Sequence, residues 1–215
     1  MKTIYYISGL GADERVFKYL NLQGVNEKYI KWETPQKHET LKHYCKRLTE
    51  QIDLGNEIVL VGVSFGGIVA QEIAKIIKVE KVIIISSIKS AKEFSFQLKL
   101  VRFFCLHKLV PSRFMKWSNL LTGDYYFYTQ TKAESALLRA IIEDTDMFFM
   151  KWAIEEIIKW DNTSIDHNLT HIHGDKDRIF PIRKIRNAIR INDGGHFMIV
   201  NRAKEIAEII EKEIN

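Results

Sequence analysis

Residues 57–66 read EIVLVGVSFG and are the most informative ten positions of the chain. After Glu57 the run is apolar as far as Val63, which is typical of a strand covered by helices on both faces. From Phe65 to Lys78 the apolar residues recur with helical spacing. This stretch therefore predicts a buried strand, a sharp turn at Ser64 and a following helix.

Strand and helix signals alternate along most of the chain. Runs rich in β-branched and aromatic residues predict strands, and spaced apolar residues predict helices. Strands are predicted at 2–8, 28–33, 57–63, 81–87 and 169–173, and further helices at 13–20, 39–52 and 202–214. This alternation favours a mostly parallel sheet with right-handed crossovers. The predicted fold class is therefore α/β.

The length of 215 residues and the 46% hydrophobic content fit one globular domain with a large core. Between Lys89 and Asp161 the strand signals stop, and Phe and Trp residues occur at helical spacing. We therefore predict that residues 89–161 form a helical cap, inserted into a core made of residues 1–88 and 162–215.

Several classes of protein do not fit the composition. The first residues lack the features of a secretory signal, and the longest apolar stretch, Ile58 to Ala70, is too short to span a bilayer, so we expect a cytoplasmic protein. Cys45 and Cys105 lack the spacing of zinc ligands and are expected to be reduced core residues. The net charge of +5 is modest, and we predict no nucleic-acid partner.

Gly62, Ser64 and Gly66 match G-x-S-x-G in the setting that this motif requires, after a strand and before a helix. A serine on so sharp a turn needs small neighbours, because a Cβ at either glycine would collide with the adjoining strand or helix. The turn lifts the hydroxyl clear of the sheet, and the helix N-terminus adds partial positive charge. Ser64 is therefore the candidate nucleophile.

A serine hydroxyl needs a base that takes its proton, and the base needs a carboxylate that orients it. After this type of turn the expected chain order is serine, acid, histidine. A loop with two aspartates, at residues 173–177, follows the last predicted strand, and His196 comes later, so the order holds. Asp124 and Asp161 stay open as alternative acids, although neither follows a core strand.

The other histidines favour structural or surface roles. His171 and His173 lie two residues apart at the end of a strand, but no third ligand has matching spacing, so we predict no metal site. The remaining ones are expected on the surface: His38, His43, His107 and His167.

With these motifs the sequence resembles the α/β-hydrolase superfamily, in its compact form with a helical cap, over nearly the whole chain. The family signature H-G-x-x-D-x-x-x-P is present at residues 173–181. The resemblance implies that Asp177 is the acid and His196 the base. It also implies an oxyanion hole formed by the backbone N–H groups of Phe65 and Leu10, and it implies no cofactor.

The sequence departs from the family pattern near the site. The first loop begins with Ser8-Gly9, where many members have His-Gly, and the chain starts on the strand that precedes this loop. We therefore expect a six-stranded sheet without the antiparallel hairpin that usually comes first. Between Asp177 and His196 there is room for one helical turn, where the family often has a full helix.

The inserted segment carries the predicted substrate pocket and the most basic part of the chain. An apolar pocket over Ser64 has five aromatic candidates, with ordinary helix packing as the alternative: Phe103, Phe104, Phe148, Phe149 and Trp152. Between Lys89 and Lys116 there is one acidic residue, Glu93, and there are seven basic ones: Lys89, Lys92, Lys99, Arg102, Lys108, Arg113 and Lys116. Such a segment can contact an anionic membrane or an acidic carrier protein, and a plain solvated face is the alternative.

The resemblance implies a serine hydrolase that cleaves a carboxylic ester or thioester of a small, largely apolar substrate through an acyl-enzyme. Two alternatives stay open. Members of the superfamily also catalyse acyl transfer and other non-hydrolytic reactions with similar triads, and the same scaffold can bind a small molecule without catalysis. The sequence does not reveal the oligomeric state.

Overall fold

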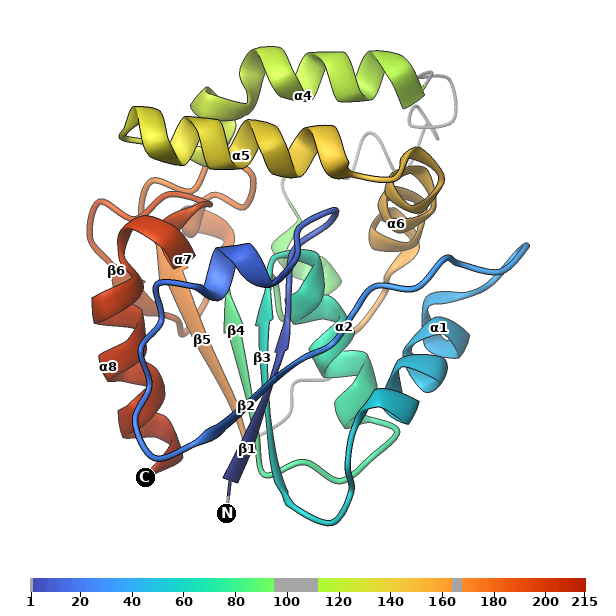
Figure 1. Ribbon diagram of the computed structural model, residues 1–215, viewed down its shortest axis with the longest axis vertical. Coiled ribbons are helices and arrows are strands. Elements are labelled where there is room, and N and C mark those ends of the chain that lie inside the picture. Colours follow the sequence, from blue (N-terminus) through green and yellow to red (C-terminus); the bar gives the residue numbers. More distant parts are fainter. Residues whose placement is uncertain (1, 95–111, 164–167) are drawn as a thin grey trace.

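The computed structural model describes residues 2–94, 112–163 and 168–215 (Figure 1). Its sheet has six strands in the order β2-β1-β3-β4-β5-β6, and each neighbouring pair is parallel. This confirms the six-stranded sheet predicted from the sequence. The strands are β1 (Lys2–Ile7), β2 (Asn26–Tyr29), β3 (Glu57–Val63), β4 (Lys81–Ile85), β5 (Leu169–Gly174) and β6 (Ile189–Ile191).

The two edge strands differ from their predictions. β2 ends at Tyr29, earlier than the predicted strand at 28–33, and its last three residues are exposed. The sequence does not predict β6, because this strand has three residues and only Ile191 is buried. Edge strands lack the continuous apolar run that marks the central ones, so their sequence signal is weak.

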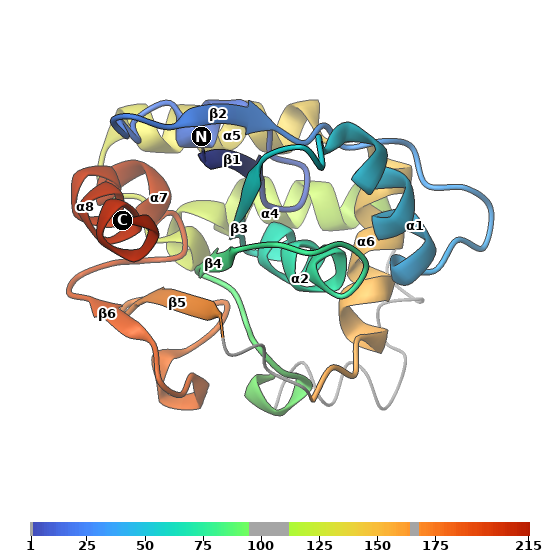
Figure 2. The same cartoon turned by 90° about the horizontal axis from the view of Figure 1, so that it is seen from below.

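Side chains of successive strand residues point to opposite faces of the sheet, and helices cover both faces. Tyr6 of β1 packs in the cluster that contains α7 and α8, and Tyr5 packs in the opposite cluster with α1 and α2. Figure 2 shows α8 on one side of the strands and α1 and α2 on the other. These helices are α1 (Leu41–Leu48), α2 (Phe65–Ala74), α7 (Met198–Asn201) and α8 (Ala203–Ile214).

Three further helices lie over the carboxyl ends of the strands (Figure 1): α4 (Ser112–Phe127), α5 (Lys132–Asp144) and α6 (Met147–Lys159). They belong to the segment for which a helical cap is predicted. Side chains fix where two of them begin, because Thr131 and Asp146 accept hydrogen bonds from the N–H groups of Glu134 and Phe149. None of the helices within the described ranges is both long enough and apolar enough to cross a membrane.

A shorter element replaces one predicted helix, and the connection before His196 holds a single turn, as predicted. The helix expected at 13–20 is a single 3₁₀ turn, η1 (Glu14–Phe17), and the connection between Asp177 and His196 holds a 3₁₀ turn, η5 (Ile182–Lys184), as well as β6. Cys45 is a buried free thiol, as expected. Cys105 lies outside the described residues.

Candidate active site

Ser64 lies at the carboxyl end of β3, at the turn into α2. Its φ and ψ angles are 52° and −118°, a left-handed conformation that residues with a side chain rarely adopt. The Ser64 N–H donates to the Ile85 carbonyl at 2.9 Å, and the Ser87 hydroxyl donates to the Ser64 carbonyl at 2.7 Å. The end of β4 therefore holds the serine in this strained conformation.

The two glycines of the motif allow β1, β3 and α2 to approach one another. A Cβ on Gly62 would lie 2.3 Å from the carbonyl oxygen of Gly66, and a Cβ on Gly66 would lie 2.1 Å from the carbonyl oxygen of Ile7. No backbone contact of this kind is that short, so only glycine fits at either position. The collisions expected from the sequence are confirmed.

His196 lies between Ser64 and Asp177, which come from distant parts of the chain. Its Nε2 is 3.0 Å from Ser64 Oγ, and its Nδ1 is 2.8 Å from Asp177 Oδ2. The other carboxylate oxygen of Asp177 accepts the N–H groups of Ile179 and Phe180, each at 2.8 Å. The carboxylate is buried with both oxygens bonded, so it holds the imidazole in one orientation.

These contacts determine which atom donates in each hydrogen bond. A carboxylate accepts only, so the proton of the neutral His196 ring lies on Nδ1, which donates to Asp177. Nε2 then carries the lone pair and accepts the hydroxyl proton of Ser64. Such an arrangement can take a proton from the serine and later return it to a leaving group.

Aromatic side chains enclose the imidazole. The rings of Phe127 and Phe180 lie 5.2 and 5.7 Å from the His196 ring, measured between centroids. The end of α4 also contacts the loop before the histidine, because a Cβ on Gly195 would lie 2.3 Å from the Cβ of Tyr128. The helical layer over the sheet therefore packs directly against the loop that carries His196.

A pair of histidines, His171 and His173, is buried on β5, beside Asp177. His173 Nε2 donates to the Phe180 carbonyl at 2.7 Å, so its Nδ1 accepts from His171 Nε2 at 3.1 Å. Burial lowers the pKa of His173, and it lowers the pKa of His171 well below the usual value. The pair supports the loop that presents Asp177. In the described part of the chain no cluster of His, Cys, Asp and Glu is arranged to hold a metal ion.

The buried neutral state of His171 predicts a loss of stability in mild acid. Its folded pKa lies below the unfolded value of about 6.5, so the unfolded chain binds more protons under that pH, and the free energy of unfolding decreases as the pH falls. One such group gives a slope of up to about 1.4 kcal/mol per pH unit. Urea unfolding from about pH 7.5 to about pH 5 should therefore show a smaller decrease for His171→Gln than for the wild type.

His38→Asn is the matched control for this series. His38 is exposed, and its φ of 58° suits asparagine, so the wild-type slope should persist. Identical slopes for the wild type and His171→Gln would contradict the assignment of a buried neutral imidazole to His171.

The two backbone N–H groups expected to form an oxyanion hole, those of Phe65 and Leu10, belong to segments that lie next to Ser64. Phe65 is the first residue of α2, so its N–H has no partner within the helix. Leu10 follows Gly9, and a Cβ on Gly9 would lie 3.5 Å from the Cβ of Ser64. The first loop of the chain thus runs directly beside the serine.

The predicted substrate-binding aromatics occupy different environments. Phe148 is 55% exposed, whereas Phe149 is 5% exposed and packs among other rings, 6.4 Å from the ring of Phe65. Trp152 is half-buried, and its indole N–H donates to the carbonyl of Glu39 at 2.8 Å. Two of the five, Phe103 and Phe104, lie outside the described residues. A role of these side chains in substrate binding stays a prediction.

Other sequence expectations are settled by contacts away from the serine. Asp124 bonds to Thr129 at 2.8 Å and pairs with Arg139, so it is engaged elsewhere, and Asp161 is exposed. Lys89 does not belong to a solvated basic face, because it is 5% exposed and its ammonium donates to the carbonyl of Arg186. His38 and His43 are exposed as predicted. His107 and His167 lie outside the described residues, as do Lys99, Arg102 and Lys108.

Three side chains near the site are not singled out by the sequence: Trp32, Phe127 and Phe180. Trp32 lies just beyond β2, and polar neighbours on both sides hide it from any apolar pattern. Its place after the carboxyl end of a parallel strand is the signal that could have found it, because ligands in α/β sheets bind outside those ends.

Comparison with known proteins gives one partial family match. The model of the Uncharacterised protein family (UPF0227) matches residues 15–100, which include β2, α1, β3, Ser64 and α2 but cover less than half of the 215 residues. No curated protein sequence matches the chain.

Solved structures are similar over the whole chain. MenH from S. aureus has a TM-score of 0.76 at 16% identity, covering 100% of this chain and 95% of that one. A hydrolase from Oleispira antarctica has a TM-score of 0.75 at 15% identity, with 100% and 92% coverage. A thermophilic esterase from Thermogutta terrifontis has a TM-score of 0.72 at 15% identity, with 100% and 89% coverage. Together with the sheet order, these likenesses show the fold that the sequence resemblance implies.

Proposed function

We propose that this chain, which has the α/β-hydrolase fold, is a serine hydrolase that cleaves a carboxylic ester or thioester through an acyl-enzyme. The observation that carries the proposal is the position of His196, within hydrogen-bond distance of Ser64 Oγ and Asp177 Oδ2 together. A base between a nucleophile and an orienting carboxylate is the arrangement that activates a serine.

Each group has a defined part in the proposed reaction. Ser64 Oγ attacks the acyl carbon while Nε2 of His196 takes its proton, and the resulting imidazolium is stabilised by Asp177. The N–H groups of Phe65 and Leu10 donate to the oxygen that becomes negative. Nε2 then returns the proton to the departing alcohol or thiol, and a water molecule, activated in the same way, releases the acid and regenerates Ser64.

The proposed substrate is small and largely apolar. Aromatic rings surround both the imidazole and the serine turn: Phe127 and Phe180 lie beside His196, and Trp32 stacks on Phe65 with 5.5 Å between ring centroids. Apolar walls with few convergent polar groups suit an apolar acyl chain. Names of similar structures, which include esterases, favour the same class of bond.

The contact with an anionic membrane or an acidic carrier protein stays a separate proposal. Much of the basic segment that motivates it lies outside the described residues, and the buried Lys89 is no longer part of it. On α4, which begins in that segment, Leu121 and Tyr125 are exposed at a spacing of four residues, so they lie on one face of the helix. Exposed apolar side chains on one face favour contact of this helix with a membrane or another protein.

Turnover of p-nitrophenyl esters and acyl thioesters of graded chain length tests the proposed function. The wild type should hydrolyse the apolar short-chain members, and Ser64→Ala should lower kcat by at least about 10⁴-fold, because the nucleophile is removed. Ser135→Ala, on α5, should keep wild-type turnover. Release of the acyl group to an added alcohol rather than to water would favour the transferase alternative, and a folded protein that turns over no member would favour a binding protein.

A further inference from the structure

One peptide group beside Ser64 has its carbonyl held from two sides. The Gly9 carbonyl accepts the indole N–H of Trp32 at 3.2 Å and the backbone N–H of Ala12 at 3.0 Å. The Ser8 hydroxyl closes the same loop by donating to the Ala12 carbonyl at 2.6 Å. The orientation of the Gly9–Leu10 peptide is therefore fixed at its carbonyl end.

The opposite end of this peptide is the proposed oxyanion donor. In a trans peptide the C=O and N–H bonds point in opposite directions, so holding the Gly9 carbonyl toward Trp32 and Ala12 directs the Leu10 N–H away from them. Gly9 itself lies beside the serine, because a Cβ added to Gly9 would lie 3.5 Å from the Cβ of Ser64. A rotation of this peptide would turn a carbonyl, in place of an N–H, toward the reacting group.

Trp32 also contacts the residue that supplies the second donor. Its ring is stacked on that of Phe65, with 5.5 Å between centroids and 25° between planes, and lies 5.2 Å from the ring of Phe149. Packing against two buried rings restricts the indole to one orientation. A single side chain thus touches both halves of the proposed oxyanion hole.

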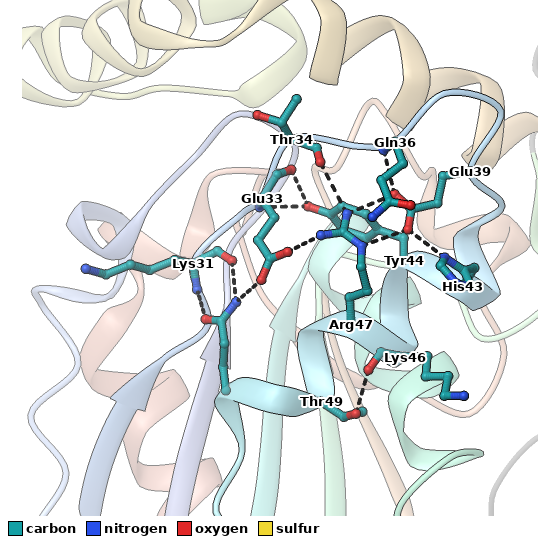
Figure 3. Close-up of polar contacts among 11 residues, drawn as sticks. Lys31, Glu33, Thr34, Gln36, Glu39, His43, Tyr44, Lys46, Arg47 and Thr49 are labelled. Atoms are coloured by element: carbon teal, nitrogen blue, oxygen red, sulfur yellow. Dashed lines mark hydrogen bonds and ion pairs between the residues drawn. The ribbon is translucent and has the colours of Figure 1, made fainter.

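Side chains from α1 and η2 (Thr49–Gln51) bond to the backbone of Lys31 and Glu33, the two neighbours of Trp32 in the sequence; both are labelled in Figure 3. The Lys31 N–H donates to Gln51 Oε1 at 2.9 Å, and the Gln51 amide donates back to the Lys31 carbonyl at 3.0 Å. On the other side, Tyr44 accepts the Glu33 N–H at 3.0 Å and donates to the Glu33 carbonyl at 2.8 Å. Both neighbours of Trp32 therefore have their N–H and C=O groups occupied.

An ion-pair network extends this support (Figure 3). Arg47 pairs with Glu33 and donates to Glu39 Oε1 at 2.8 Å, and the Glu39 side chain is 1% exposed. The bond from Arg47 lowers the pKa of Glu39 to about 2, so this carboxylate stays charged at neutral pH. The segment after β2 is thus held rigidly although it has no regular structure.

We propose that Trp32 is a positioning residue for the oxyanion hole. Its indole N–H holds the Gly9–Leu10 peptide in the orientation that directs the Leu10 N–H toward the carbonyl oxygen of a substrate bound at Ser64. This inference rests on the proposed function. It makes Trp32, which does not itself bond to the reacting atoms, a determinant of the reaction rate and not of substrate affinity.

Trp32→Phe tests the proposal because it keeps an aromatic ring and removes the N–H. Loss of a whole oxyanion donor lowers kcat by about 10²–10³-fold, and here the bond from Ala12 remains, so we expect a decrease of about tenfold. KM should change less than about twofold, because a donor that acts in the transition state contributes little to ground-state binding. A trifluoromethyl ketone, which forms a tetrahedral adduct, should bind about tenfold more weakly, in parallel with kcat/KM.

Trp160→Phe is the matched control. Trp160 is buried, whereas Trp32 is half-buried, and the Trp160 indole N–H likewise donates one hydrogen bond, to Glu72 at 2.8 Å, away from the serine. A structural loss alone would lower the melting temperature of both variants and leave kcat and ketone affinity in each near wild type. Equal kinetic effects in the two variants, or a Trp32→Phe enzyme with wild-type kcat and ketone affinity, would overturn the proposal.

Replacing the Trp32 indole with benzothiophene gives a second variant, in which the packing of the ring is preserved. The ring keeps its shape and loses only the N–H, so the same tenfold decrease in kcat is expected. Ser64→Ala distinguishes a failure of the proposed function from a failure of the role proposed for Trp32. If Ser64→Ala is inactive and both Trp32 variants behave like the wild type, only the role of Trp32 is wrong. If Ser64→Ala retains turnover, the proposed function itself fails.

Discussion

Replacement of His196 with alanine is expected to lower kcat by about 10⁴–10⁶-fold and to leave the fold intact. The imidazole is the only group shown within hydrogen-bond distance of the Ser64 hydroxyl among the described residues, at 3.0 Å, so no other base is placed to take its proton. The residual rate would come from substrate binding and from the oxyanion donors. Steady-state turnover of the best ester measures the loss.

The His196 side chain is buried between Phe127 and Phe180, so the fold of His196→Ala is checked independently of its turnover. The circular dichroism spectrum of His196→Ala should match that of the wild type, and the control His38→Asn, at an exposed position whose φ of 58° suits asparagine, should keep full turnover. A decrease in kcat of less than about tenfold for a folded His196→Ala protein would mean that another base acts.

Gly66→Ala should lower the free energy of unfolding by about 3 kcal/mol or more. The added Cβ would lie 2.1 Å from the carbonyl oxygen of Ile7 and 2.3 Å from that of Ser8. Ile7 is the last residue of β1 and pairs with Gly62 of β3, and Ser8 follows it directly, so these backbone atoms cannot move away without disturbing the sheet ladder. Urea unfolding followed by tryptophan fluorescence measures the change.

Gly123→Ala is the control for a methyl group added to a helix. A Cβ at Gly123, in α4, meets only side-chain carbons at 3.4 Å, which is ordinary contact. The higher helix propensity of alanine should make this variant as stable as the wild type or more stable, by up to about 1 kcal/mol. A Gly66→Ala protein of wild-type stability would show that β1 and α2 do not approach as closely as described.

The sequence predicts the centre of the molecule well, because local and tertiary requirements coincide there. β3 spans Glu57–Val63, the predicted range, since a strand buried on both faces needs an uninterrupted apolar run. The candidate site, in which Asp177 and His196 are expected from the family resemblance, also lies where the sheet topology places such residues. Ser64, Asp177 and His196 each lie just after the carboxyl end of a strand or in the last loop, and those ends meet at one edge of a parallel sheet.

Features that depend on contacts between distant segments are harder to predict. β6 is recognisable only by its pairing with β5, and Trp32 becomes important only because the first loop places Gly9 beside it. Lys89 shows the opposite error. A lysine among other basic residues suggests a solvated surface, yet it is buried and bonded to backbone carbonyls. The spacing of residues within one segment does not indicate which residues of other segments they contact.

The central claim is that Ser64 is a nucleophile activated by His196, and the most direct measurement of it is the location of a covalent adduct. After reaction with a fluorophosphonate, peptide mass spectrometry should find one phosphonyl group, on Ser64, in the wild type and none in Ser64→Ala. An unmodified Ser64 in the folded wild-type protein, under conditions in which a known serine esterase reacts completely, would contradict the account.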